Sequence, residues 1–203
     1  MTNRSAQDGA GAGLVDFLHL MRRMRAEDAW KAAQSHRSLA RYLLEEAHET
    51  VEAIESGDLE HLKEELGDLL LQVYFQVVIA EDAGEFTMDD VVDELTAKMV
   101  RRNPHIFEPG EGPRPTYDEL VESWQAVKTA EKPHRSSPAD GIPASLPALL
   151  YADKVLNRTT YIPGDGELGD RLLALAAEAH EQGLDPEQEL REAVRRLVDQ
   201  PPA

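Results

Sequence analysis

The sequence has no cysteine, few aromatic residues and little positive charge. Without cysteine, neither a disulfide nor a thiolate metal site can form. Only 5% of the residues are aromatic and 30% are charged, which favours an all-α protein over a β-sandwich. The formal net charge of −18 argues against nucleic acid or an anionic membrane as a partner, because both are bound through basic surfaces.

Long hydrophobic runs are also missing. No apolar segment approaches the ~18 residues that a membrane-spanning helix needs. The first 13 residues lack the apolar segment of a signal peptide, so we expect a cytoplasmic protein that does not enter a membrane. A length of 203 residues allows one substantial core, or one domain with a smaller appendage.

The hydrophobic pattern predicts an all-α helical bundle. Residues 1–13 are predicted to form a flexible tail, and helices are expected over about 14–25, 38–55, 58–81 and 88–102. Asp58 and Thr87 are typical N-caps, and Gly84 is placed to end the third helix. Because that helix is apolar on nearly all sides after Leu69, we expect it to be buried in a bundle or a dimer.

The second half of the chain contains a partial repeat. Residues 104–115 are predicted to form a loop, Thr116 to begin a short helix, and residues 133–143 to form a linker. The segment Glu65–Leu71 recurs in similar form at Glu167–Leu173. Residues 141–166 contain no acidic pair three residues apart, so we interpret 14–132 as the main helical domain and 144–203 as a degenerate partial copy.

Two acidic pairs are placed symmetrically about Gly57. Glu46 and Glu49 lie 11 and 8 residues before it, and Glu65 and Asp68 lie 8 and 11 residues after it. If two helices meet at this glycine, all four carboxylates lie at one level, roughly 12–17 Å from the turn. Hard oxygen ligands at one level suit Mg²⁺, or Mn²⁺ in its place.

Two other interpretations of these acids are open. Exposed acidic pairs three residues apart are common in an acidic helical protein, although four carboxylates brought level would repel one another without a cation. A carboxylate di-iron site uses Glu-x-x-His pairs, and Glu45 with His48 has that spacing. Its second candidate, Asp58 with His61, lies at the turn, which favours the oxygen-only site.

Cationic and aromatic residues cluster after the acidic pairs. Lys98 and Arg102 share one helix face, with Arg101 beside them, and Trp124 and Lys128 repeat the four-residue spacing. These side chains are suited to binding phosphates and stacking a nucleobase. The alternatives are cations that stabilise a helix C-terminus and a tryptophan that packs on the core.

The combined motifs resemble those of MazG-like nucleoside triphosphate pyrophosphohydrolases. The chain has the Glu-Glu-x-x-Glu and Glu-x-x-Asp signatures, and the similarity lies in the segments Tyr42–Glu49, Glu64–Val73, Lys98–Phe107 and Trp124–Lys132. One departure is Asp28-Ala29-Trp30-Lys31, where the family often has Cys-Pro-Trp-Asp. The resemblance covers about residues 14–132.

The resemblance implies an all-α fold, at least a dimer, and hydrolysis of an NTP or dNTP to the monophosphate and pyrophosphate. It assigns Mg²⁺ to Glu46, Glu49, Glu65 and Asp68, with Glu45 as an accessory residue that orients water. It assigns nucleotide binding to the basic and aromatic residues Lys98, Arg101, Arg102, Trp124 and Lys128. Clearing of aberrant nucleotides is the implied role, and a non-enzymatic helical binding protein is the alternative.

Overall fold

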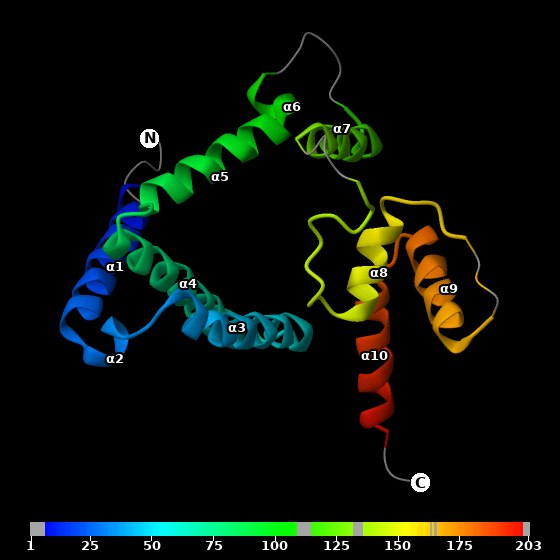
Figure 1. The fold of residues 1–203 in the computed structure, drawn as a ribbon, viewed down its shortest axis with the longest axis horizontal. Coiled ribbons are helices and arrows are strands. Elements are labelled where there is room, and N and C mark those ends of the chain that lie inside the picture. The colour runs from blue at the N-terminus through cyan, green and yellow to red at the C-terminus, as the bar shows by residue number, and fades with distance from the viewer. Residues whose placement is uncertain (1–6, 109–114, 132–135, 163, 165, 201–203) are drawn as a thin grey trace, which may run out of the picture. The chain divides into compact units, whose positions relative to one another are not determined.

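The computed structural model describes residues 7–108, 115–131, 136–162, 164 and 166–200, and every regular element in these ranges is an α-helix. The prediction of an all-α fold is therefore confirmed. Figure 1 shows the helices in chain order: α1 (Gln7–Glu27), α2 (Ala29–Ala32), α3 (His36–Ser56), α4 (Leu59–Ala83), α5 (Met88–Arg102), α6 (Pro104–Phe107), α7 (Tyr117–Ala130), α8 (Ala148–Leu156), α9 (Leu168–Glu181) and α10 (Pro186–Val198).

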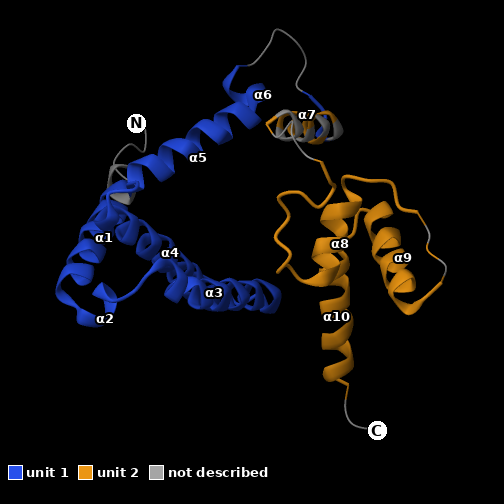
Figure 2. Ribbon diagram, viewed as in Figure 1, with its two compact units in different colours: residues 1–117 blue, residues 118–203 orange. Residues whose placement is uncertain are grey.

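The helices form two compact units, residues 1–117 and 118–203 (Figure 2). The division lies at the start of α7, whereas the sequence analysis placed the end of the first domain at residue 132. Among the described residues, α7 makes no extensive contact with α1 to α6 or with α8 to α10. None of the described helices is long and apolar enough to cross a membrane.

The core of the first unit forms where α4 packs against α3 and α1. Its buried residues come from all three helices, and Met21, Leu39 and Val78 are each only 1% exposed. Phe17 contacts the ring of Tyr74 edge-on, with the ring centroids 5.0 Å apart. The apolar second half of α4 is thus buried, as its composition predicts.

A tight turn joins α3 to α4. Ser35 caps α3 through a capping box with Ser38, and α3 ends at Gly57, whose φ of +73° is accessible to glycine at little cost. Asp58 caps α4 by accepting hydrogen bonds from the backbone amides of Glu60 and His61. The predicted turn and the predicted N-cap are both confirmed.

The first helix begins at Gln7, whereas a flexible tail was predicted up to residue 13. Each glycine in a helix costs only about 1 kcal/mol relative to alanine, so a well-anchored helix can extend through several. Ion pairs with α4 anchor α1: the Arg22 guanidinium lies 2.7 and 2.8 Å from the Glu81 carboxylate oxygens, and Arg25 lies 2.7 Å from Asp82.

The helix α5 has the predicted limits, with Thr87 and Asp90 forming a capping box. None of its residues is buried, and its only extensive packing among the described helices is with the short helix α6. Helix α6 lies in a stretch predicted to be a loop. It begins with Pro104, which is compatible with the first helical position because that residue needs no amide hydrogen there.

The second unit packs α8, α9 and α10 together around a small buried cluster of Leu156, Ala176 and Ala177. His180 of α9 lies 2.8 Å from the Asp153 carboxylate of α8. The described part of the predicted linker, from residue 136 onward, is also tied to α8. Arg158 donates hydrogen bonds to the backbone carbonyls of Pro138 and Asp140, at 2.9 and 2.8 Å.

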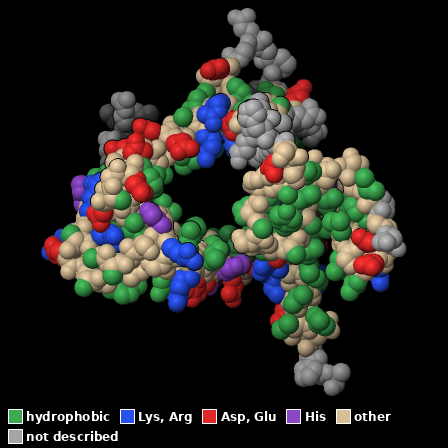
Figure 3. All heavy atoms as spheres, in the orientation of Figure 1, with side chains coloured by type: hydrophobic (Ala, Val, Ile, Leu, Met, Phe, Trp, Pro, Cys, Tyr) green, Lys and Arg blue, Asp and Glu red, His purple; other side chains and the backbone are tan. Residues whose placement is uncertain are grey.

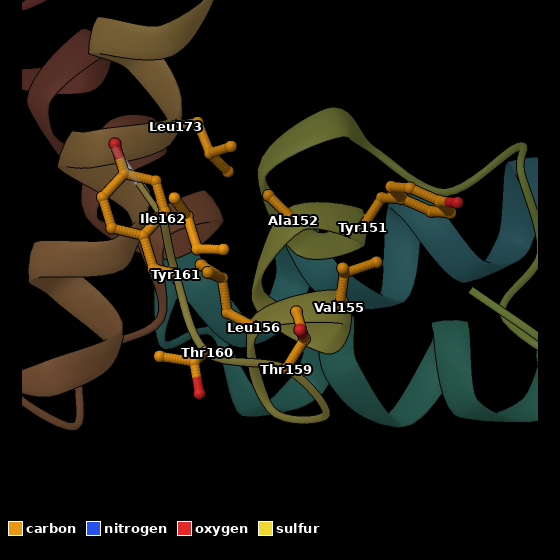
Figure 4. Close-up of a pocket in the computed structure, with 9 residues that line it drawn as sticks. All are labelled: Tyr151, Ala152, Val155, Leu156, Thr159, Thr160, Tyr161, Ile162 and Leu173. Atoms are coloured by element: carbon orange, nitrogen blue, oxygen red, sulfur yellow. The ribbon is translucent and has the colours of Figure 1, made fainter. Parts of the chain in front are cut away.

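A cavity of about 310 Å³ lies in this unit, between α8, the segment that follows it and α9 (Figure 4). Leu156, Tyr161 and Leu173 are among its lining residues. No Asp, Glu, His, Lys or Arg is among the described residues that line the cavity, so its only polar side-chain groups are the hydroxyls of tyrosine and threonine.

Candidate metal centre

Packing of α3 against α4 brings acidic side chains from both helices together. Carboxylate oxygens of Glu46 and Glu49 on α3 and of Glu65 on α4 all lie within 4.8 Å of one another. Within the described ranges, no other group of three or more His, Cys, Asp or Glu side chains approaches as closely. Three of the four predicted ligands are therefore neighbours.

The fourth predicted ligand, Asp68, lies one turn after Glu65 on α4 and is half-buried. Its negative charge helps to raise the pKa of Glu46, so the two carboxylates are near one another. We call Glu46, Glu49, Glu65 and Asp68 the carboxylate cluster. Glu45, the predicted accessory residue, is exposed next to Glu46 and is not a member of the close group.

The cluster is held at the contact between the two helices by Thr50. This residue is only 6% exposed, and its hydroxyl donates to the Glu46 backbone carbonyl at 2.7 Å. The same oxygen lies 3.5 Å from the Glu65 backbone carbonyl. The small hydroxyl thus lets the backbones of α3 and α4 approach closely at the level of the carboxylates.

Burial and repulsion act together on Glu46. Its pKa is raised, first because burial disfavours the charged carboxylate and then because the charges of Asp68, Glu49 and Glu65 repel it. A hydrogen bond from Gln72 acts in the opposite direction. The groups that shift this pKa include three neighbouring carboxylates and no Lys or Arg, so negative charge is concentrated around Glu46.

Two residues that the sequence analysis did not assign contact the cluster. Gln72 is 5% exposed and donates from Nε2 to Glu46 Oε1 at 3.5 Å. The Nε2 atom of His61 lies 3.0 Å from Glu65 Oε1, although His61 was expected to remain at the turn. Helical spacing could have indicated both residues in the sequence, because His61 precedes Glu65 by one turn and Gln72 follows Asp68 by one turn.

The predicted nucleotide-binding residues do not belong to this group. Lys98, Arg101 and Arg102 lie on α5, which has no extensive packing against α3 or α4 among the described residues. Trp124 is half-buried on α7, in the second unit. Lys128 lies on the same helix, and its side chain is outside the described part of the structure.

The partial repeat does not form a similar cluster. Glu167 precedes α9 and is exposed, and its side chain makes no capping hydrogen bond. The Asp170 carboxylate lies against Gly164, so closely that a β-carbon at Gly164 would be 2.2 Å from Asp170 Cγ. Among the described residues of the second unit, the two acids of the repeat thus have no opposing acidic pair close to them.

Comparison with known proteins gives a consistent result. Residues 34–107 match the model of the MazG nucleotide pyrophosphohydrolase domain. The chain is 31% identical over 221 residues to the nucleoside triphosphate pyrophosphohydrolase/pyrophosphatase MazG of Thermotoga maritima, covering 94% of this chain and 84% of that protein. It is 39% identical over 192 residues to a nucleoside triphosphate pyrophosphohydrolase of Mycobacterium tuberculosis.

The last alignment covers 93% of this chain but only 57% of the mycobacterial protein, so the chain spans little more than half of that relative. Among solved structures, a MazG-related protein from Thermotoga maritima is 23% identical, with a TM-score of 0.48. That match covers 55% of this chain and 96% of the other.

Proposed function

The chain belongs to the MazG nucleotide pyrophosphohydrolase family, and on this premise we propose that its first unit hydrolyses nucleoside triphosphates, NTPs or dNTPs, to the monophosphate and pyrophosphate. The observation that supports this most strongly is the convergence of Glu46, Glu49 and Glu65 within 4.8 Å across two helices. Removal of aberrant nucleotides is the cellular role that suits such an activity.

We propose Mg²⁺, with Mn²⁺ as a substitute, as the ion of the carboxylate cluster. The donors are carboxylate oxygens, the type of ligand that these hard cations prefer, and the chain has no cysteine to supply a thiolate. The pKa of Glu46 is raised first by burial and then by repulsion from neighbouring carboxylates, and a cation would relieve that repulsion. A di-iron centre is less well supported, because Glu45 is exposed and the close group contains no histidine.

In the proposed reaction, a water molecule attacks the α-phosphorus and pyrophosphate leaves. When bound, the ion supplies positive charge to the triphosphate and acidity to a coordinated water. Glu46, Glu49, Glu65 and Asp68 would hold the ion between α3 and α4. Glu45, exposed beside Glu46, is placed at the solvent side, where it orients water.

Nucleotide binding is proposed for the basic end of α5 and for α7. Lys98, Arg101 and Arg102 lie in the last two turns of α5 and bind phosphate oxygens in this proposal. Trp124 stacks on the base and Lys128 holds a phosphate, as the family resemblance implies. Since α5 is not packed against α3, this arrangement requires either movement of α5 or a second copy of the chain.

A homodimer or larger homo-oligomer is therefore part of the proposal. Leu66, Leu70 and Val73 are 50%, 38% and 41% exposed and form one stripe along α4. Hydrophobic side chains on α5 are also exposed, and Figure 3 shows apolar side chains reaching the surface in both units. Light scattering on wild type and Leu70→Glu tests this, with a fall in molecular mass expected for the variant.

The activity is tested by measuring pyrophosphate release from a panel of NTPs and dNTPs with Mg²⁺. We compare wild type with Glu46→Ala and with Glu52→Ala, an exposed glutamate on the same helix outside the carboxylate cluster. We expect release by wild type and Glu52→Ala and loss in Glu46→Ala. No release by wild type from any nucleotide rules out the activity, and equal release by all three rules out the site.

A further inference from the structure

We propose that Gln72 is a positioning residue for the metal centre: its side-chain amide orients the Glu46 carboxylate within the carboxylate cluster. This inference rests on the proposed metal site and extends it to a residue that carries no charge. Gln72 follows Asp68 by one helical turn and Glu65 by two, so all three share one face of α4. It is 5% exposed, which places its amide inside the contact between α3 and α4.

The direction of the amide follows from its hydrogen bond. The Nε2 atom lies 3.5 Å from Glu46 Oε1, so the nitrogen faces the carboxylate and the amide oxygen faces elsewhere. The reverse orientation would place two oxygen acceptors against each other. A donor on one oxygen of Glu46 restrains the plane of the carboxylate, and therefore the direction of its second oxygen.

This restraint matters because three like charges act on Glu46. Repulsion from Glu49, Glu65 and Asp68 favours side-chain conformations that turn the Glu46 carboxylate out of the cluster. A buried neutral donor opposes that movement without adding a competing positive charge. Outer partners of this kind orient ligands before a cation arrives, and their loss lowers metal affinity.

The oxygen of the Gln72 side-chain amide also indicates a ligand at the carboxylate cluster. Gln72 Oε1 is buried and has no hydrogen-bond partner among the described residues. Buried polar atoms are nearly always paired, and an apolar side chain would fill the same space without leaving an acceptor unpaired. The free acceptor is suited to a hydrated cation, whose water molecules donate hydrogen bonds.

The test compares Gln72→Met with Gln76→Met in the full chain. Methionine preserves the length and most of the volume of glutamine but removes the amide. Gln76 lies one turn further along α4, and its side chain is hydrogen-bonded to His36. Gln76→Met therefore also removes one glutamine hydrogen bond, but outside the carboxylate cluster, which makes it a matched control. Binding of Mn²⁺ alone, without nucleotide, is measured by electron paramagnetic resonance of the free ion.

We expect Gln72→Met to weaken Mn²⁺ binding by about tenfold or more and Gln76→Met to leave it near the wild-type value. Pyrophosphate release by Gln72→Met should recover at high Mg²⁺, so that the half-saturating Mg²⁺ concentration rises while the maximal rate changes little. A loss that reflects only damaged packing would lower the maximal rate and would not be recovered.

Wild-type affinity for Mn²⁺ in Gln72→Met overturns the inference and leaves the metal site standing. Failure of the wild type itself to bind Mn²⁺ overturns both the metal site and the inference. If Gln72→Met does not fold, Gln72→Asn replaces it, because this variant retains the amide but is one methylene too short to reach Glu46. Weakened binding by Gln72→Asn supports the inference, and unchanged binding contradicts it.

Discussion

The same four residue types, Glu-Leu-Gly-Asp, lie within helix α4 of the first unit and at the start of helix α9 of the second, and the two copies differ in what faces them. Glu65-Leu66-Gly67-Asp68 and Glu167-Leu168-Gly169-Asp170 precede similar apolar segments. Each helix is followed by a glycine with positive φ, Gly84 and Gly183, at +68° and +72°. The acids of α4 meet those of α3, whereas Asp170 meets Gly164. The motif is therefore half of a site, and the opposing helix makes it complete.

The next helix along the chain differs as well. In the second unit, α10 packs against both α8 and α9, and its N-cap Asp185 accepts hydrogen bonds from two backbone amides. In the first unit, α5 is equally well capped but leaves Val92, Leu95 and Met99 between 40% and 50% exposed. A capped helix with an uncovered apolar face is typical of a partner surface, which agrees with the proposed homodimer.

The largest expected effect separates the two copies of the acidic motif. Asp68→Ala should lower pyrophosphate release by at least about a hundredfold, because a metal ligand supports several kcal/mol of charge stabilisation and ~1.4 kcal/mol corresponds to tenfold. Asp170→Ala should leave release near the wild-type rate. Steady-state assays at one Mg²⁺ concentration measure both, and an equal loss in the two variants would contradict the assignment of a single site.

The next effect, on stability and only indirectly on activity, is expected from the two cores. Leu39 is 1% exposed and packs α3 onto α4. Leu39→Ala should therefore lower the free energy of unfolding of the first unit by about 2–5 kcal/mol. It should also weaken metal binding. Leu156→Ala, at 9% exposure in the smaller core, should destabilise the second unit and spare metal binding. Hydrogen exchange resolved by peptide measures each unit separately.

Weakened metal binding in Leu156→Ala, equal to that in Leu39→Ala, would instead show that the two units are energetically coupled.

The smallest expected effect concerns pH. The pKa of Glu46 is higher in the folded chain than in the unfolded chain, so the folded state binds a proton more readily. Between these two pKa values, the free energy of unfolding of the metal-free protein should fall as pH rises. Glu46→Gln should flatten this dependence, which denaturant titrations in EDTA across a pH series measure.

Addition of Mg²⁺ should reverse this trend in the wild type, because the cation binds the ionised carboxylates. It should stabilise the wild type near neutral pH and have little effect on Glu46→Gln. Identical pH profiles for the two metal-free proteins would mean that neither burial nor repulsion raises the pKa of Glu46 in the folded chain.

Much of the first unit could be predicted because its signals are local. Asp58, Thr87 and Gly84 act within one helical turn, so the sequence defines the limits of α5 and the turn between α3 and α4. The level at which the carboxylates meet also follows from counting residues along two helices. For these reasons the proximity of Glu46, Glu49 and Glu65 was predicted correctly.

Other features depend on contacts between distant segments. One is the start of α1 at Gln7, because no local signal in residues 7–13, with their three glycines, indicates a helix. The packing of α5 depends on partners far along the chain or on another chain. Gln72 was missed because an uncharged residue in an apolar run gives no sign of function until its neighbour is known.

Because the connection at Gly57 is short, the number of residues between it and each acidic pair sets the height and the direction of the carboxylates on their helices. One residue inserted between Gly57 and Glu65 would shift the acids of α4 by ~1.5 Å and rotate them by ~100° about the helix axis, away from Glu46 and Glu49. An insertion after Asp68 would leave the pairs in phase. The distance along the chain from Gly57 is thus a stricter constraint on this family member than the identity of most residues in between.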